Sequence, residues 1–133
     1  MSYAEQRILL NGIDTAVFTA GEGEPIVFLH GGGTATGFDA LLPLEERARL
    51  IVPNHPGFGA SADDPAIDDI QDYVLHYLDL FDYLGLDGFG LAGHSFGGFL
   101  AARIALYQPS RIRRLVLASP FGLTTPGHET VSL

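Results

Sequence analysis

The sequence Gly93-His94-Ser95-Phe96-Gly97-Gly98 decides how this chain is interpreted. An apolar run, Phe89 to Ala92, comes directly before it, and a helix-like run follows. A serine held in such a tight turn between a strand and a helix must adopt a strained backbone conformation with its hydroxyl pushed outward. The three glycines around it let strand and helix approach each other without a clash. We therefore predict that Ser95 has a positive φ and exposes its Oγ at the carboxyl edge of a sheet.

Short apolar runs alternate with helix-like runs along most of the chain. A hairpin turn is predicted at Asn11-Gly12, between strand-like segments at 7–10 and 15–19. Further strands are expected at 26–29, 49–52, 89–92 and 112–118, with helices at 38–47, at 70–84 and from Ser95 to about Tyr107. Alternating strands and helices imply right-handed crossovers and a parallel sheet. The expected fold is α/β, a mostly parallel sheet of about six strands with an N-terminal antiparallel hairpin and helices on both faces, in one domain over residues 1–133.

The expected helix at 70–84 has a clear apolar stripe and clear end signals. Asp68 or Asp69 is the expected N-cap, and Gly85 is the expected stop at the C-terminal end. The stripe that we predict to face the core consists of Ile70, Val74, Leu78, Phe81 and Leu84.

The charge of the chain limits its partners. Among its 133 residues are 7 arginines, no lysine and 16 acidic residues, which give a net charge of −9. This balance argues against nucleic acid or an anionic membrane as a partner. The cluster of aspartates at 63–72 is typical of helix capping and solvation, and there is no cysteine, so we expect no metal and no cofactor. The glycine-rich stretch 30–37 lacks the Lys-Ser/Thr of a phosphate-binding loop.

A cytoplasmic location is the expectation from the N-terminal residues and from hydropathy. The first five residues carry no basic segment followed by an apolar stretch. The sequence also contains no run of 18 apolar residues.

Two further glycine-rich stretches follow predicted strands. They are His30-Gly31-Gly32-Gly33 and His55-Pro56-Gly57-Phe58-Gly59-Ala60-Ser61. Together with residues 93–98, and in this order, they closely resemble the α/β-hydrolase superfamily, and the resemblance spans nearly the whole chain. Within it the chain is most similar to small lid-bearing enzymes: esterases, C–C bond hydrolases of aromatic degradation and cofactor-free perhydrolases. Ser95 argues against the halide- and epoxide-cleaving relatives, which usually place aspartate at this position.

The resemblance implies a role for several residues. Ser95 would be the nucleophile, attacking a carbonyl carbon to form an acyl-enzyme. The oxyanion hole would combine the N–H of Phe96 with that of Gly32 or Gly33, since glycine lets the backbone come within about 3 Å of the developing oxyanion. The position of Phe96 at a helix N-terminus also favours negative charge. Phe38, Phe58 and Phe121 are the apolar side chains expected to line the substrate pocket.

The resemblance implies a truncated α/β-hydrolase core that lacks the lid and the last strands, so the catalytic acid and histidine of the superfamily would fall at positions beyond Leu133. The alternative acid position reads Ser119-Pro120-Phe121 and offers no carboxylate, and His128 is the one candidate for a surrogate base. The other histidines are expected to be structural. His30 would brace a loop, His55 would pack in one, His94 would point away from Ser95, and His76 would face solvent between Asp72 and Asp79.

The leading interpretation is a serine hydrolase core that acts on a small-molecule carboxylic ester, or on a C–C bond next to a carbonyl, and needs a complementary C-terminal segment. One alternative is a non-catalytic fragment or binding module that keeps the pocket without turnover. Another is perhydrolase or acyltransferase chemistry on the same Ser95. The strand at 112–118 would end the sheet as an apolar edge, so we expect a homodimer or a complementing C-terminal segment to cover it.

Overall fold

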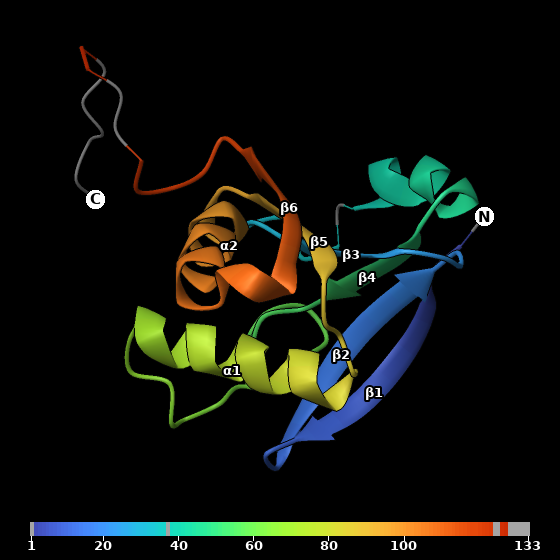
Figure 1. The fold of residues 1–133 in the computed structure, drawn as a ribbon. Helices are drawn as coiled ribbons and strands as arrows, with labels where there is room; N and C mark the ends of the chain where they lie inside the picture. The colour runs from blue at the N-terminus through green and yellow to red at the C-terminus, as the bar shows by residue number, and fades with distance from the viewer. Residues whose placement is uncertain (1, 37, 124–125, 128–133) are drawn as a thin grey trace.

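The computed structural model describes residues 2–36, 38–123 and 126–127 (Figure 1). In chain order its elements are β1 (Ala4–Leu10), β2 (Ile13–Ala20), β3 (Pro25–Leu29), the 3₁₀-helix η1 (Asp39–Glu46), β4 (Arg49–Pro53), α1 (Ile70–Tyr83), β5 (Phe89–His94), α2 (Phe96–Tyr107), the 3₁₀-turn η2 (Pro109–Arg111) and β6 (Ile112–Ala118).

The strands form one six-stranded sheet in the order β1-β2-β4-β3-β5-β6. β1 pairs with β2 and β2 with β4 in antiparallel fashion, whereas the β3–β4, β3–β5 and β5–β6 pairs are parallel. The hairpin turns where the sequence predicts it, because Asn11 and Gly12 both have positive φ, at 50° and 83°. The predicted α/β fold with an N-terminal antiparallel hairpin is confirmed.

The helices α1 and α2 lie together over one face of the sheet (Figure 1). The core lies between this face and the two helices, and its fully buried side chains include Val27, Ile51, Phe81, Leu91 and Leu100. Among the parallel strands, β4 is buried on both faces, whereas alternate residues of β3 and β5 are only half-buried and most of β6 is exposed.

The opposite face of the sheet is covered at β2 and β4 by η1. Phe18 pairs with Val52, the neighbour of core-facing Ile51, so Phe18 points to this second face, where it packs against Phe38 with ring centroids 5.3 Å apart. The helix predicted at 38–47 is thus a 3₁₀-helix. Pro43 lies inside it, and proline cannot continue an α-helical hydrogen-bond ladder.

Helix α1 has the predicted end signals. Asp69 is its N-cap, and the Asp69 carboxylate accepts a hydrogen bond from the Asp72 N–H at 3.0 Å. Gly85 follows the helix with a φ of 66°, the left-handed conformation in which glycine commonly ends helices.

The prediction that His76 faces solvent is wrong. The side chain is only 7% exposed, and its ring packs against Tyr77 with centroids 5.1 Å apart. Helix α1 buries a wider surface than one stripe, because Tyr77 and Leu80 are fully buried as well. Within the described part of the chain, His76 Nε2 has no hydrogen-bond partner.

Candidate active site

Ser95 lies between β5 and α2 with φ 53° and ψ −115°, which confirms the predicted positive φ. Such a conformation costs about 1–3 kcal/mol and persists only where the surroundings enforce it. Here the Ser95 N–H donates to the Ala118 carbonyl at 3.1 Å, and the Ser95 carbonyl accepts from the Phe121 N–H at 2.9 Å. The end of β6 and the segment after it thus hold both the N–H and the carbonyl of Ser95 in place. The side chain of Ser95 is half-buried.

The glycines around Ser95 are sterically required. A Cβ on Gly93 would lie 2.3 Å from the Gly97 carbonyl oxygen, and one on Gly97 would lie 2.0 Å from the Leu29 carbonyl oxygen. At Gly98 the nearest atom, in Pro120, would be 3.0 Å away. The first turn of α2 therefore rests directly against the end of β3, which brings the loop after β3 next to Ser95.

That loop borders the serine through Gly31. Gly31 is buried, and a Cβ placed on it would lie 3.4 Å from Ser95 Cβ and 3.0 Å from His94 Nδ1. Gly32 and Gly33 are exposed, and a Cβ on either would meet nothing within 4 Å. Gly31 was not assigned a role from the sequence, although it stands in the quoted glycine run.

The third proposed donor, Phe96, is the first residue of α2. The first N–H groups of a helix have no intrahelical acceptor, so the Phe96 N–H is available to a ligand. The assignment of Gly32, Gly33 and Phe96 to an oxyanion hole stays a prediction.

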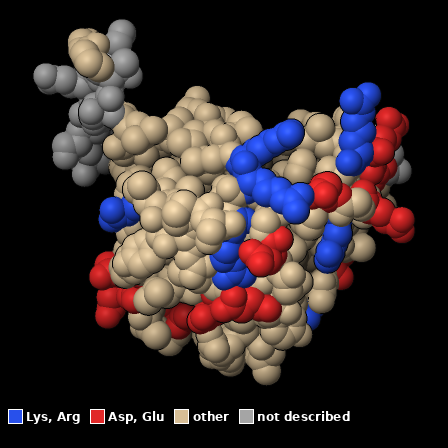
Figure 2. All heavy atoms as spheres, in the orientation of Figure 1, with Lys and Arg blue, Asp and Glu red and all other residues tan. Residues whose placement is uncertain are grey.

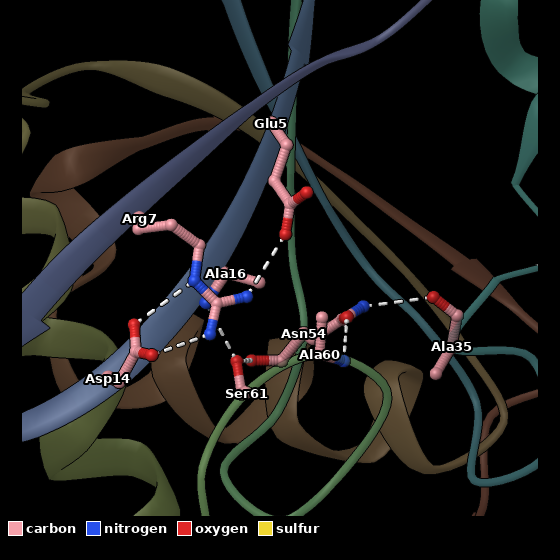
Figure 3. A network of polar contacts seen from close by, with 8 residues as sticks. All are labelled: Glu5, Arg7, Asp14, Ala16, Ala35, Asn54, Ala60 and Ser61. Carbon is pink, nitrogen blue, oxygen red and sulfur yellow. Dashed lines mark hydrogen bonds and ion pairs between the residues drawn. The ribbon is translucent and has the colours of Figure 1, made fainter.

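Asn54 ties the loop after β4 to the loop after β3 (Figure 3). Its amide Nδ2 donates to the Ala35 carbonyl, and its Oδ1 accepts from the Ala60 N–H, each at 2.9 Å. The Ser61 hydroxyl donates to the Asn54 carbonyl at 3.0 Å and accepts from the Ala16 N–H at 2.9 Å. Both side chains are buried, and the sequence reasoning assigned neither. Their position at the end of a strand and in the glycine-rich loop was the available signal.

The aromatic residues predicted to line a substrate pocket fall into separate places. Phe58 lies near Phe96, with ring centroids 6.3 Å apart, and both rings pack edge-on against His55. Phe38 is buried against the hairpin, next to Phe18. Phe121 is 54% exposed beside Phe99. The structure therefore brings Phe58 together with Phe96, and pocket lining by the three predicted residues stays a prediction.

His30 opens the loop after β3, His55 lies in the loop after β4, and both side chains are fully buried. Burial lowers the pKa of His55 to about 3, helped by the neighbouring His30, and burial likewise lowers the pKa of His30. Both imidazoles are therefore neutral near pH 7. Their ring nitrogens are occupied by hydrogen bonds to Tyr77, to the carbonyls of residues 30 and 31 and to the His55 N–H.

Within the described residues no histidine is hydrogen-bonded to the Ser95 hydroxyl. His94 is half-buried and borders Gly31. His128, the candidate surrogate base, lies outside the described residues.

Arginine and acidic side chains lie beside one another on the face in Figure 2, and much of that surface carries neither. Arg111 pairs with Asp82 at 2.7 Å and Arg113 with Glu24 at 2.8 Å. Within residues 2–36, 38–123 and 126–127 no three histidine or acidic side chains gather closely enough to hold a metal ion. No helix in the same residues has the length and apolar character needed to span a membrane.

Several known proteins resemble this chain in sequence or fold. The chain is 34% identical over 123 residues to 2-hydroxy-6-oxo-2,4-heptadienoate hydrolase of Pseudomonas putida strain F1, a match that covers 88% of this chain and 45% of that protein. It is also 34% identical over 123 residues to 1-acylglycerol-3-phosphate O-acyltransferase of Arabidopsis thaliana, covering 84% of this chain and 29% of that protein.

Among solved structures, a serine hydrolase involved in carbazole degradation superposes with a TM-score of 0.84 at 25% identity, over 94% of this chain and 51% of the other. The chain spans about half the length, or less, of these relatives. A family model for the alpha/beta hydrolase fold matches residues 24–132, which is most of the chain. The chain therefore belongs to the α/β-hydrolase family.

Proposed function

We propose that this chain is the nucleophile-bearing part of a serine hydrolase that cleaves a small-molecule carboxylic ester, or a C–C bond next to a carbonyl, through an acyl-enzyme. The observation that carries the proposal is the enforced positive φ of Ser95 at the start of α2, beside the glycine loop after β3. Strained serines of this kind at a strand-to-helix turn present their hydroxyl for nucleophilic attack.

In the proposed reaction the Ser95 Oγ attacks the substrate carbonyl carbon while a general base takes the hydroxyl proton. The Phe96 N–H and an N–H from Gly32 or Gly33 would stabilise the oxyanion that develops. Collapse of the tetrahedral intermediate expels an alcohol from an ester, or a carbanion, protonated as it leaves, from a C–C bond. Water then hydrolyses the acyl-enzyme. A complementary C-terminal segment would supply the base and its acid.

The C–C bond alternative is favoured by the Pseudomonas putida relative, whose name describes a hydrolase of a hydroxy-oxo-dienoate. The pair Phe58 and Phe96 supports an apolar or aromatic acyl group, because both rings lie by the turn that carries Ser95. A small-molecule substrate is common to both alternatives.

Labelling with a fluorophosphonate tests the nucleophile. We expect covalent modification of the chain that is absent in Ser95→Ala and present in Ser110→Ala, a control serine in the middle of η2. Peptide mass spectrometry should place the adduct on Ser95. An adduct elsewhere, or equal labelling of wild type and Ser95→Ala, contradicts the proposal.

The rate of ester hydrolysis tests whether this chain supplies its own general base. Without base and acid, a triad enzyme keeps roughly 10³–10⁴-fold acceleration over water from its oxyanion hole and binding. We expect hydrolysis of a p-nitrophenyl ester at that residual level, with little further loss in Ser95→Ala, because the oxyanion hole and substrate binding do not need the hydroxyl. Rates typical of an intact esterase, lost in His128→Ala, would instead identify His128 as the base.

Two alternatives keep the same site. Acyl transfer to an acceptor other than water, including peroxide, is favoured by the likeness to the acyltransferase of Arabidopsis thaliana. A rise in ester consumption when an alcohol or peroxide is added would indicate it. A non-catalytic binding module is favoured by the lack, in the described residues, of a histidine bonded to Ser95, and complete absence of fluorophosphonate labelling would support it.

For partners we propose that a second copy of the chain, or a complementing C-terminal segment, covers the β6 edge. Leu115 and Val116 of this edge strand are 40% and 61% exposed. A groove of about 550 Å³ lies beside Val116, and its lining includes the apolar residues Ile26, Gly90 and Ala92 as well as Glu24, Arg113 and Arg114. An exposed apolar edge strand with an apolar groove supports pairing with another segment.

A further inference from the structure

Four buried hydrogen bonds connect the middle of α1 to the loop that borders Ser95. The Tyr77 hydroxyl contacts His55 Nδ1, and His55 Nε2 lies 2.6 Å from the His30 carbonyl oxygen. The His55 backbone N–H lies 3.0 Å from His30 Nε2, and His30 Nδ1 lies 2.7 Å from the Gly31 carbonyl oxygen. The side chains of Tyr77, His55 and His30 are all fully buried.

The chemistry of the partners fixes the direction of each bond. A backbone carbonyl only accepts and a backbone N–H only donates. His30 Nε2 therefore accepts from the His55 N–H, and His30 Nδ1 must carry the proton that it donates to the Gly31 carbonyl. His55 Nε2 must likewise donate to the His30 carbonyl. A neutral His55 then has a lone pair on Nδ1, so the Tyr77 hydroxyl donates to it.

Burial keeps this arrangement in one protonation state. It lowers the pKa of His55 to about 3 and raises the pKa of Tyr77 well above its usual range, so the imidazole stays neutral and the phenol stays protonated near pH 7. The rings of His30 and His55 also contact each other, with centroids 3.8 Å apart and planes tilted by 37°. With both imidazoles neutral, one arrangement of protons satisfies all four hydrogen bonds, and such a fully satisfied buried network is rigid.

The last bond sets the orientation of one peptide plane. The peptide between Gly31 and Gly32 is planar and trans, so its N–H points opposite to its C=O. The Gly31 carbonyl is held by His30 and also accepts from the Thr34 N–H at 3.3 Å. The Gly32 N–H must therefore point away from the buried histidines. It belongs to the loop in which the preceding residue, Gly31, borders Ser95.

From this geometry we infer that Tyr77 and His55 are positioning residues, which act through His30 to orient the Gly32 N–H as an oxyanion donor for Ser95. The inference rests on the function proposed above, because it gives Gly32 the donor role. Preorganised donors are effective because they need no reorientation when charge develops. Helix α1, which does not touch the substrate, would thus help to set the geometry of the reacting site.

The histidine tautomers test the inference in the unaltered chain. Long-range ¹H–¹⁵N correlation spectra at pH 7 should show His30 as the Nδ1–H tautomer and His55 as the Nε2–H tautomer. The opposite tautomer at either histidine, or a protonated ring, would overturn the inference without any substitution.

The variant Tyr77→Phe removes only the hydroxyl that donates to His55, at the end of the hydrogen-bond network farthest from Gly31. We expect the Gly32 amide resonance to shift, together with the His55 ring nitrogens. Tyr83→Phe is the matched control, since Tyr83 lies at the end of the same helix and is 59% exposed. His55→Gln is a second variant that keeps an N–H for the His30 carbonyl but replaces the Nδ1 acceptor for Tyr77 by a differently placed amide oxygen, and it should shift the Gly32 amide in the same way. A Gly32 amide that is unmoved in folded Tyr77→Phe or His55→Gln contradicts the inference.

Fluorophosphonate kinetics separate the two proposals. Tyr77→Phe should lower the maximal rate of Ser95 modification about tenfold, with little change in the concentration of half-saturation; loss of a whole donor costs roughly 10²–10³-fold. Equal maximal rates in wild type and Tyr77→Phe overturn the positioning role. Absence of Ser95 labelling in wild type would instead count against the proposed function, and the tautomers and the Gly32 amide would still decide whether Tyr77 orients this peptide.

Discussion

The Cα of Gly97 faces the carbonyl oxygen of Leu29 so closely that a Cβ on Gly97 would lie 2.0 Å from that oxygen. Leu29 is the last residue of β3, and Gly97 is the second residue of α2. This contact brings Ser95, at the start of α2, to the glycine loop that follows β3. The proposed nucleophile and the proposed oxyanion donors come from segments about 60 residues apart, and here they meet.

Gly97→Ala should destabilise the chain by about 3 kcal/mol or more, because backbone atoms on both sides must move to admit the methyl group. Urea unfolding followed by circular dichroism measures the change. Gly90→Ala is the matched control: its Cβ would meet Ile26 at an ordinary 3.5 Å, so the substitution should be neutral or stabilise by up to about 1 kcal/mol. Equal stabilities of the two variants would show that the contact with Leu29 is not a constraint.

Asn54→Ala should cost about 1–3 kcal/mol, because it removes one bond to each of Ala35 and Ala60 inside the protein. The loop after β3 should also become more open to limited proteolysis between residues 31 and 38. Gln71→Ala, which removes a surface hydrogen bond to Tyr107, should cost less than about 0.5 kcal/mol. An Asn54→Ala chain as stable and as protease-resistant as wild type would mean that this amide does not hold the two loops together.

His76 should make the chain less stable in acid. Burial lowers the pKa of His76 from its ordinary 6.5 to about 4 in the folded chain, so between these values the unfolded chain binds the proton more readily. Stability therefore falls as pH drops below about 6.5, and by pH 5 the loss from this residue should reach about 2 kcal/mol. Urea unfolding at pH 7 and at pH 5 measures it.

Two substitutions of His76 separate titration from packing. Both His76→Leu and His76→Gln remove the titrating group, so both should shrink the difference between pH 7 and pH 5 by that amount. Only leucine also removes a buried polar atom, since His76 Nε2 lacks a hydrogen-bond partner in the described residues. His76→Leu should therefore be at least as stable as wild type at pH 7. A wild-type pH dependence in His76→Gln would show that another group is responsible.

The β6 edge should support self-association. We expect the purified chain to sediment as a dimer at high micromolar concentration, and Val116→Lys to sediment as a monomer, because a charge on the groove blocks apolar pairing. Leu106→Lys is the control, since Leu106 is 78% exposed on α2 rather than on the edge strand. A wild-type chain that sediments only as a monomer of 14.2 kDa would rule out the homodimer and leave a complementing segment as the proposed partner.

Much of the local structure could be predicted because its causes lie within a few residues. Asn11-Gly12 specifies its own turn through positive φ, Asp69 caps α1 through its own side chain, and the glycines at 93 and 97 permit the turn at Ser95. The apolar runs at 26–29 and 89–92 predicted strands, and β3 and β5 lie there. Pro43 was a local signal that was not used, and the expected helix around it is a 3₁₀-helix.

The site required contacts between distant segments, and these depend on how the sheet is ordered. Placement of β3 between β4 and β5 brings the loops after these three strands together at one edge, and so lets Asn54 reach Ala35 and Gly31 border Ser95. His76 was expected to face solvent, and Tyr77 was not among the predicted core residues. Helical periodicity shows which stripe of a helix is apolar, but not how much of the helix its neighbours cover.

By itself, the sequence determined the fold class, the hairpin and the strained serine turn, since backbone preferences and apolar periodicity are properties of short segments. Only the tertiary structure decided which groups surround that serine. The buried hydrogen bonds from Tyr77 through His55 and His30 to Gly31 connect helix α1 with the loops after β4 and β3. No regular spacing of these residues in the sequence indicates that they meet. The reason is physical: a buried polar group must find a partner wherever packing places one, and packing is settled by the whole fold.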